Sequence, residues 1–497
     1  MNEPGKSDSS VVPANPPNNT TTKVAAEAGE ERGLAKGNTT DLTRPGPRAG
    51  QGVSSGLDRV REAARRDKDA RFTALLHHVD LDRLASAYRA INPRAATGVD
   101  KVTWADYGTD LEANLSDLLA RVHSGTYRAS PSRRAYISKA DGRKRPLGIA
   151  TLEDKVLQRA VVEVLNAIYE VDFLGFSYGF RPQRSPHDAL DALATGIFRK
   201  KVNWILEADI RDFFTRLDHA WLREFLERRI ADERVLRLIY KWVNAGVIED
   251  GEWTASEAGA PQGASASPLL ANIYLHYVLD QWAKQWRDQH ARGDMVIVRF
   301  ADDFVCGFEH QGDAKQFLHE LRKRFTKFGL ELHPDKTRLI EFGRYAAHNR
   351  AARGLGKPET FDFLGFTHIC GKGRDGRFRL RRITVSKKMR AKLREVHDQL
   401  KARRHRPIPE QGRWLASVVR GHCAYYAVPG NLDAVRSFRT QATRSWLKAL
   451  RRRSQKTSLT WTRMNRLASA WLPPVCVLHP YPEQRFDVRT LGRSPVR

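Results

Sequence analysis

Two adjacent aspartates interrupt a long apolar run, and this arrangement limits what the chain can fold into. The run Met295-Val296-Ile297-Val298 leads to Asp302 and Asp303, and Phe304-Val305-Cys306 follows them. β-Branched and aromatic residues on both sides predict a β-hairpin with the acidic pair at its tip. Two carboxylates about 4 Å apart repel by roughly 4 kcal/mol at an effective dielectric near 20. A solvated Asp-Asp turn is the simpler interpretation, whereas a third carboxylate nearby would indicate bound divalent cations.

A second strand pattern supplies that third carboxylate. Residues 204–214 read Trp-Ile-Leu-Glu-Ala-Asp-Ile-Arg-Asp-Phe-Phe. Strand alternation places Asp209 on the same face as Glu207. Taken alone, Asp209 is more simply interpreted as a strand-end cap. If its strand lies beside the hairpin, Asp209 converges on Asp302, and the pattern predicts a two-metal site with Asp303 as a weaker or outer ligand. Oxygen ligands with open positions suit Mg²⁺, with Mn²⁺ as a substitute.

The charge balance indicates a polyanionic partner. The 497 residues include 85 Lys and Arg against 57 Asp and Glu, a net charge of +28. Residues 371–460 hold 25 basic and 5 acidic residues, a net of +20 in under a fifth of the chain. A concentrated basic region favours nucleic acid over a membrane surface as the partner.

The cysteines and the apolar segments exclude several other classes. Cys306, Cys370, Cys423 and Cys476 have no C-x-x-C spacing, so neither a zinc site nor a disulfide framework is predicted. No apolar run approaches the length of a membrane span, and the first residues lack a signal-peptide pattern.

The patterns along the chain predict an α+β protein with several parts. Residues 1–55 are rich in Pro, Asn, Thr, Gly and Ser and predict a disordered extension. Residues 56–200 show helical periodicity with a hairpin turn near residue 140, and residues 201–370 alternate strands and helices. We expect arginine-rich helices over 371–460 and a C-terminal tail over 461–497.

Several collinear motifs carry a resemblance to a known family. They are Asp209-x-x-x-Phe213-Phe214, Pro261-Gln262-Gly263, Phe300-Ala301-Asp302-Asp303, Leu332-His333-Pro334-Asp335-Lys336-Thr337 and Phe363-Leu364-Gly365-Phe366. Their order resembles the palm of a reverse transcriptase. With the segments 145–149, 177–182 and 267–275, the chain is similar to bacterial group II intron-encoded reverse transcriptases over roughly residues 57–490.

The resemblance implies a right-hand polymerase. Residues 56–200 would contain N-terminal helices and the fingers, and residues 201–370 the palm with an antiparallel sheet and the catalytic aspartates. Residues 371–460 would form a basic helical thumb that doubles as the maturase (X) domain. Many family members add a C-terminal HNH endonuclease. Residues 461–497 are too few, and lack paired cysteines, to hold one.

The resemblance also assigns roles to single residues. Asp209, Asp302 and Asp303 would be catalytic metal ligands, and Lys336 would neutralise or protonate the leaving pyrophosphate. The remaining roles concern substrate binding: Lys139 and Arg145 on the nucleotide phosphates, Phe214 as the steric gate against a ribose 2′-hydroxyl, Gln262 beside the base and sugar, and Phe363, Leu364 and Gly365 on the primer. Each residue taken alone has an ordinary structural explanation, and only their shared order favours these roles.

Two departures from the family pattern stand out. Phe300 replaces the Tyr that commonly precedes the Ala-Asp-Asp triplet, which leaves the metal ligands intact. After Gly263, the residues Ala264-Ser265-Ala266 replace the usual run of small and β-branched residues. This change bears on how firmly the nucleotide or template is packed and leaves the reaction class unaltered.

The sequence therefore predicts an RNA-directed DNA polymerase that also binds intron RNA and assists its splicing and mobility. Its expected partners are intron RNA or an RNA template, a DNA primer or target, and deoxynucleotides, with no membrane. Homodimer formation stays open. The expected location is the bacterial cytoplasm, with nucleoid association during mobility. Two alternatives also stay open: a domesticated reverse transcriptase in phage defence, repair or CRISPR adaptation, and an RNA-binding maturase without polymerase activity.

Overall fold

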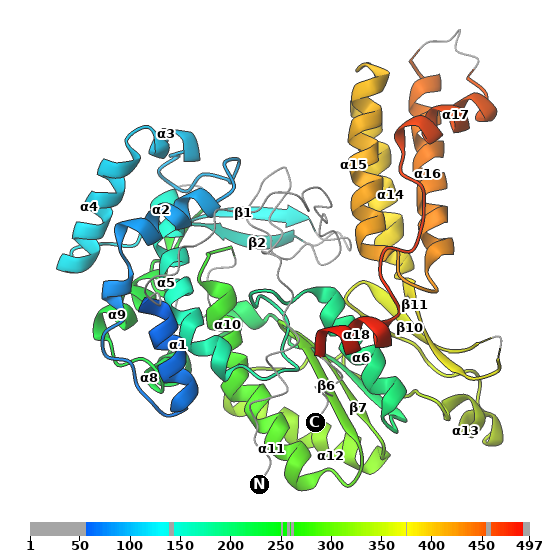
Figure 1. The fold of residues 1–497 in the computed structure, drawn as a ribbon, viewed down its shortest axis with the longest axis horizontal. Coiled ribbons are helices and arrows are strands. Elements are labelled where there is room, and N and C mark those ends of the chain that lie inside the picture. Colours follow the sequence, from blue (N-terminus) through cyan, green and yellow to red (C-terminus); the bar gives the residue numbers. More distant parts are fainter. Residues whose placement is uncertain are drawn as a thin grey trace.

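The computed structural model describes residues 56–138, 144–249, 252–255, 259, 263–373, 375–453 and 459–490. Helices and three separate sheets share this part of the chain, and most strand pairs are antiparallel. The predicted α+β class is therefore confirmed. The predicted disordered extension, residues 1–55, lies outside the described residues. In Figure 1 the first helices lie at one end of the molecule and α14–α17 at the other, with the strands between them.

A group of amphipathic helices forms the N-terminal end. Its members are α1 (Gly56–Arg66), the 3₁₀ turn Leu76–His78, α2 (Leu81–Ala90), α3 (Trp104–Gly108), α4 (Leu111–Ser124), α5 (Leu152–Asp172), α8 (His219–Glu227) and α9 (Glu233–Val243). α5 is the central element, because it buries residues on most of its circumference. Thr151 begins it by accepting a hydrogen bond from the Asp154 backbone N–H.

A small sheet extends from this helical group. It contains β1 (Ser132–Ser138), β2 (Lys144–Ile149), β4 (Val247–Glu249) and β5 (Glu252–Thr254) in the order β2-β1-β4-β5. β1 pairs antiparallel with β2 and parallel with β4. The predicted hairpin turn near residue 140 lies outside the described residues.

The central sheet is antiparallel and is covered on both faces. It contains β3 (Trp204–Asp209), β6 (Met295–Phe300), β7 (Asp303–Phe308) and β8 (Arg338–Glu341) in the order β6-β7-β3-β8. The helices around it are α6 (Pro186–Arg199), α7 (Phe213–Arg216), α10 (Ser267–Leu275), the π-helical turn His276–Asp280, α11 (Gln281–His290) and α12 (Gln311–Lys327).

Alternate side chains of this sheet enter two different cores. Leu206 and Ile297 pack into one core with α10 and α12, whereas Ile205 and Val296 pack into a second core with α6 and the C-terminal helices. A sheet with two buried faces needs apolar residues at consecutive positions. This explains why the strands on both sides of the acidic pair are apolar at consecutive positions.

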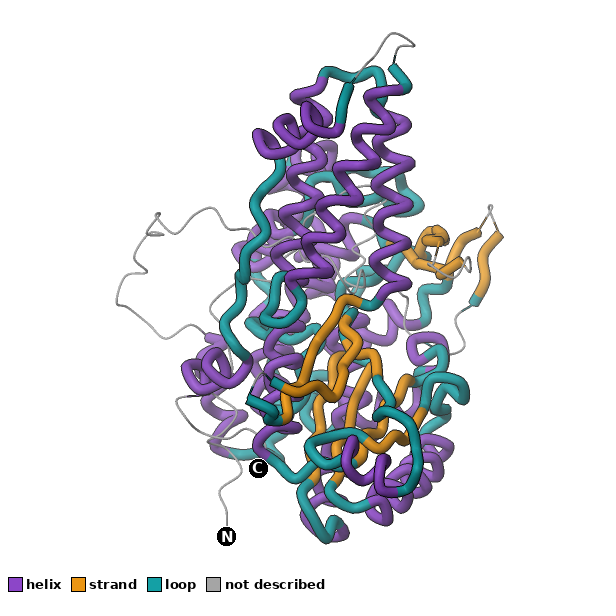
Figure 2. The backbone as a smooth tube through the Cα atoms, turned by 90° about the vertical axis from the view of Figure 1, so that its right-hand side faces the viewer, coloured by secondary structure: helices purple, strands orange, loops and turns teal. Residues whose placement is uncertain are grey.

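A third sheet and a helical bundle complete the described chain. The sheet contains β9 (Phe361–Phe363), β10 (Phe366–Lys372) and β11 (Phe378–Thr384), and the short helix α13 (Ala346–Ala352) precedes it. The bundle contains α14 (Ser386–Ala402), α15 (Ile408–Tyr426), α16 (Leu432–Arg451) and α17 (Trp461–Trp471). Figures 1 and 2 show α14, α15 and α16 side by side above these strands.

Two predictions for the C-terminal third need correction. The region predicted as helical from residue 371 begins instead with the β10–β11 hairpin, because Phe378 and Leu380 alternate with exposed residues at the period of a strand. The predicted tail contains α17 and a further helix, α18 (Pro482–Thr490). α18 returns to α6, where Arg485 forms an ion pair with Asp188 at 3.2 Å.

Two local features of the helices complete the fold. Asp218 accepts a hydrogen bond from the Trp221 backbone N–H at 2.9 Å and caps α8. Residues 267–290 form one continuous helical run that passes through the π-helical turn. Within the described part of the chain, no helix combines the length and apolar character that crossing a bilayer requires.

One buried carboxyl joins α5 to α9. Asp154 accepts hydrogen bonds from the Tyr127 hydroxyl and from the Ser130 backbone N–H, and the Trp242 indole N–H donates to the same Tyr127 oxygen at 3.0 Å. Burial raises the pKa of Asp154 from 3.8 to about 6, although these hydrogen bonds act in the opposite direction. Because the folded pKa lies above the unfolded one, the folded state favours the protonated acid.

We predict that this group's contribution to stability is full below pH 4 and decreases as the pH rises through 6. The free energy of unfolding of the wild type relative to Asp154→Asn, whose side chain does not titrate, should fall by about 1 kcal/mol between pH 5 and pH 7.5. Denaturant unfolding of both proteins at the two pH values measures this difference. A difference that does not change with pH would contradict the prediction.

Candidate active site and metal centre

The acidic pair lies at the tip of the β6–β7 hairpin. Phe300 and Asp303 form the last cross-strand pair, so Ala301 and Asp302 make up a two-residue loop. Ala301 has a φ of 58°, and positive φ at the first loop residue is characteristic of the tight turns that join hairpin strands. The turn therefore presents two consecutive carboxylates at one end of the central sheet.

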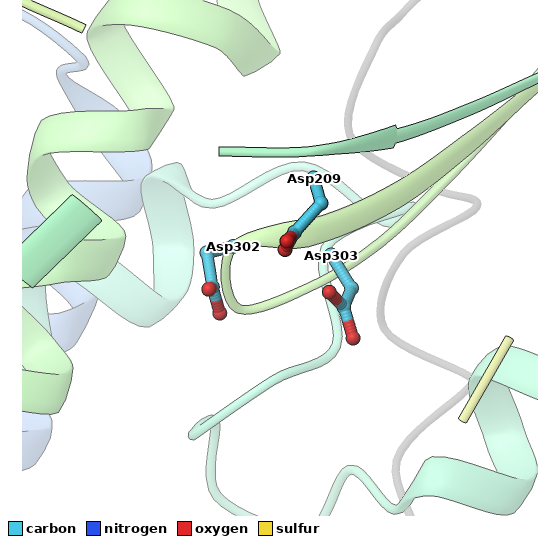
Figure 3. A group of neighbouring side chains, drawn as sticks. All are labelled: Asp209, Asp302 and Asp303. Atoms are coloured by element: carbon cyan, nitrogen blue, oxygen red, sulfur yellow. The ribbon is translucent and has the colours of Figure 1, made fainter. Parts of the chain in front are cut away.

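The neighbouring strand adds a third carboxylate at the same place. Asp209, the last residue of β3, stands opposite Asp303 in the β3–β7 ladder. One oxygen from each of Asp209, Asp302 and Asp303 lies within 4.8 Å of the others. Figure 3 shows the three side chains grouped around the turn. Asp302 is 9% exposed, whereas the other two are half-buried. Antiparallel register therefore brings together residues that are distant in the sequence.

A lysine joins this cluster from the loop before β8. The Lys336 ammonium forms an ion pair with Asp209. The loop is fixed next to β3 because the His333 backbone N–H donates to the Asp209 carbonyl at 2.8 Å, and the Lys336 backbone N–H donates to the His333 carbonyl at 3.3 Å. The Lys336 side chain is 53% exposed, so it can reach a ligand in the cleft.

Asp209 and Asp303 open into a cleft of about 540 Å³. Its lining comes from the central sheet, the loop before β8, the β9–β10 turn and the start of α14: Glu207, Ala208, Asp209, Asp303, Phe304, Val305, Asp335, Lys336, Arg338, Asp362, Phe363, Leu364, Gly365, Val385 and Lys388. The β9–β10 turn is held by the Tyr425 hydroxyl, which donates to the Leu364 carbonyl at 2.7 Å. The C-terminal helices thus fix one wall of the cleft.

A second acidic group in the cleft is already paired. Arg338 donates to Glu207 at 2.6 Å, and the Asp362 backbone N–H donates to the same carboxylate at 3.2 Å. Burial raises the pKa of Glu207, and the pairing with Arg338 opposes that shift. Glu207 is thus a link between β3, β8 and β9, which leaves Asp209, Asp302 and Asp303 as the group with metal-binding geometry.

The donor chemistry of this group fits a divalent cation. The described residues contain one cluster of three or more metal-binding side chains, and its donors are all carboxylate oxygens. Hard cations such as Mg²⁺ and Mn²⁺ prefer oxygen ligands, and Mg²⁺ sites commonly use one or two carboxylates with water and substrate phosphates. Since the cleft borders the cluster, a substrate oxygen has room to complete the coordination.

A buried arginine holds the hairpin tip from behind. Arg299, in β6, is fully buried and donates two hydrogen bonds to Asp280, at 2.7 and 2.5 Å. It also donates to the Asn272 side-chain oxygen at 3.0 Å, to the Ser177 hydroxyl at 2.7 Å and to the Ala301 carbonyl at 3.0 Å. The last bond reaches the turn itself. Burial raises the pKa of Asp280 while Arg299 opposes the shift.

The segment 177–180 closes this network over the turn. A Cβ added at Gly179 would lie 2.2 Å from the Ala301 backbone nitrogen, so a glycine is required for this close approach. The Asn272 amide donates to the Gly179 carbonyl at 2.7 Å, and the Tyr178 N–H donates to the Arg299 carbonyl at 2.8 Å. Three sequence segments therefore meet at the turn that bears Asp302.

Comparison with protein families identifies the segment that contains this site. Residues 137–368 match the family described as reverse transcriptase (RNA-dependent DNA polymerase). Residues 137–368 belong to the reverse transcriptase family. The resemblance inferred from the sequence motifs is therefore confirmed, and the acidic cluster, the Arg299 network and most of the cleft lie within the reverse transcriptase segment.

The chain is also similar to several known proteins, and the names of two of them refer to introns. It is 37% identical over 213 residues to the group II intron-encoded protein LtrA of Lactococcus lactis, covering 43% of this chain and 34% of the relative. It is 36% identical over 238 residues to protein YkfC of Escherichia coli K12, covering 42% and 62%. It is 22% identical over 232 residues to nuclear intron maturase 2 of Arabidopsis thaliana, covering 39% and 30%. The chain therefore spans less than two thirds of each of these relatives.

Some of the residues predicted to bind substrate line the cleft of the reverse transcriptase segment, and others do not. Phe363, Leu364 and Gly365 line it. Phe214 does not, because it is 5% exposed and packs edge-to-face on Phe213 in the core. Lys139 and Gln262 lie outside the described residues, and Arg145 is described only by its backbone in β2. The roles predicted for these residues stay predictions.

Sequence analysis missed the Arg299 network. Arg299 precedes the Phe-Ala-Asp-Asp motif directly, and Asp280 lies inside a helical pattern, where each charge is expected to be solvated. A signal was available, since Arg299 is a lone charge in the middle of an apolar strand. A charge in that position needs a buried partner.

We predict that Arg299→Met is strongly destabilising, because it leaves Asp280 buried without its cationic partner. Breaking such a pair costs about 3–5 kcal/mol, whereas replacing both charges by apolar residues recovers much of the loss. The denaturant midpoint should therefore fall sharply for Arg299→Met and recover partly in Arg299→Met/Asp280→Leu. The matched control Arg338→Met breaks a more exposed pair with Glu207 and should cost about 1 kcal/mol or less. Equal losses in the single and double variants would contradict the assigned role.

Proposed function

We propose that this chain is an RNA-directed DNA polymerase that also binds intron RNA and assists its splicing and mobility. The observation that carries the polymerase activity is the cluster of Asp209, Asp302 and Asp303 at a cleft inside the reverse transcriptase segment. Three oxygen donors beside an open cleft suit nucleotidyl transfer with divalent cations. The names of the lactococcal and plant relatives, an intron-encoded protein and an intron maturase, support the intron RNA and splicing roles.

We assign the parts of the right-hand polymerase as follows. The N-terminal helices and the β1–β2 hairpin act as fingers over residues 56–200, and the central sheet acts as the palm over 201–370. The bundle α14–α16 acts as the thumb and maturase domain, with the β10–β11 hairpin at its base. The net charge of +20 over residues 371–460 supports RNA binding through phosphate contacts.

The reaction is assigned to the carboxylate cluster. Asp209, Asp302 and Asp303 would hold two Mg²⁺ ions, with Mn²⁺ as a substitute. When bound, these ions activate the terminal primer hydroxyl and stabilise the leaving pyrophosphate. Lys336 pairs with Asp209 in this structure and would exchange that partner for the pyrophosphate. Phe363, Leu364 and Gly365 would hold the primer end against the cluster.

The remaining substrate contacts are proposed from the motifs alone. Lys139 and Arg145 would bind the nucleotide phosphates, since cationic side chains suit that role. Gln262 would contact the nucleotide near its base and sugar. Phe214 would exclude the ribose 2′-hydroxyl.

We predict that Asp302→Ala abolishes primer extension on an RNA template while leaving RNA affinity nearly unchanged, because it removes a metal ligand and no phosphate contact. The matched control is Asp335→Ala, which removes an exposed carboxylate from the same cleft without touching the cluster. Single-nucleotide extension in Mg²⁺ and an RNA-binding titration measure the two properties. Normal extension by Asp302→Ala would contradict the two-metal assignment.

We also predict that Phe214→Ala admits ribonucleotides into the product, because a smaller side chain no longer collides with the 2′-hydroxyl. Phe214 is buried, so the measured quantity should be the ratio of deoxynucleotide to ribonucleotide incorporation, which does not depend on the folded fraction. Phe213→Ala is the matched control, since its ring packs on the Phe214 ring in the same core. Unchanged selectivity in Phe214→Ala together with a loss in Phe213→Ala would move the gate to Phe213.

A further inference from the structure

The strand β11 separates its arginines between two faces. Arg382 points inward, is 3% exposed and forms an ion pair with Asp191 at 3.1 Å. Arg379 and Arg381 lie at positions of the opposite parity and are exposed. Neighbouring arginines of this strand therefore lie in different environments. Arg382 is neutralised inside the protein, and the others form a row on the outer face.

The outer face of the hairpin leaves space for the side chains of this row. Arg381 is opposite Ile369 in the β10–β11 ladder, and Arg379 is opposite Gly371. A Cβ at Gly371 would lie 2.7 Å from Cδ of Arg381, so the glycine leaves space for the aliphatic stem of that arginine to cross the hairpin. Arg377 continues the row beyond the last cross-strand pair and is also exposed. Alternate strand residues are about 7 Å apart, which sets the backbone spacing of Arg379 and Arg381 along β11.

These charges are weakly neutralised within the protein. Arg379 forms an ion pair with Asp375 at 3.3 Å in which both side chains are about half exposed, and such pairs contribute little and exchange readily. Among the described residues, Arg381 has no acidic partner within ion-pair distance. A row of exposed arginines with one weak internal partner is complementary to a chain of phosphates.

The row is continuous with the cleft. Asp362 lines the cleft, and the Thr367 hydroxyl donates to it at 2.6 Å from the same face of the sheet. Thr367 pairs with Ile383, which lies two residues after Arg381 on the outer face of β11. The arginine row therefore lies on the same sheet face as Asp362, two strands across from it, and leads away from the cleft along the hairpin, which Figure 1 shows below α14.

We propose that Arg377, Arg379 and Arg381 form a docking surface for the phosphate backbone of the primer–template duplex that leaves the cleft. This surface rests on the proposed polymerase function. This surface extends the contact with the duplex beyond the primer end. The duplex phosphates take the place of Asp375 as the partner of Arg379. The duplex is the occupant because the row shares a sheet face with the cleft wall.

The test measures how the affinity for a recessed RNA–DNA primer–template duplex depends on salt, without nucleotides. Replacing all three arginines by Gln should reduce the slope of log affinity against log salt by about 2 to 3, since each lost phosphate contact on a duplex contributes about 0.9. Replacing them by Lys keeps the charges and should restore most of the slope. The matched control Arg59→Gln/Arg65→Gln/Arg89→Gln removes the same charge from exposed positions on α1 and α2 and should leave the slope unchanged.

A second arm uses a structured intron RNA without a primer, and the Gln variant should bind it with the wild-type salt slope. An unchanged slope on the duplex would overturn the proposal. So would a reduced slope on the structured RNA alone, or an equal reduction on both, because the row would then serve intron RNA. Failure of the proposed function gives a different result: the wild type would not extend the primer at all, while these binding slopes would still be measured.

Discussion

The buried ion pair between Arg299 and Asp280 is the interaction on which the geometry of the acidic turn depends. It lies behind the turn, in a fully buried position, and its spare donors bind the Ala301 carbonyl and the Ser177 hydroxyl. A buried charge that loses its partner is very unfavourable, so these segments have one arrangement that satisfies them all. Because Arg299 must keep these partners, the network fixes the position of the turn that bears Asp302.

The central sheet supplies the other half of the geometry. Its strands are buried on both faces, and a shift of one residue would exchange the side chains that enter the two cores. The register between β3 and β7 is thus strongly specified, and with it the position of Asp209 opposite Asp303. The carboxylates repel one another, but the packing energy of the two cores is large enough to hold them close together.

Acidic and basic side chains are concentrated in different parts of the fold. The acidic cluster is compact and lies at one end of the sheet, whereas the basic excess lies in the hairpin and helices that follow it. The cleft lies where the two meet, and Tyr425 of the bundle fixes its wall through the Leu364 carbonyl. α18 reinforces this arrangement, because Arg485 contacts Asp188 on the helix that covers the sheet. The C-terminal bundle and the cleft wall are therefore joined by direct contacts.

The sequence by itself determined the strands of the central sheet, the turn with its two aspartates, the third carboxylate on a neighbouring strand and the position of the basic region. These features depend on local periodicity and on residue type, which can be read along the chain. Only the tertiary structure decided that Arg299 is buried, that β11 presents Arg381 outward and Arg382 inward, and that Phe214 lies in the core. Each of these outcomes depends on partners far away in the sequence, such as Asp191 for Arg382. The sequence alone does not show that a charged residue is buried, because its burial depends on elements that pack against it only in the folded chain.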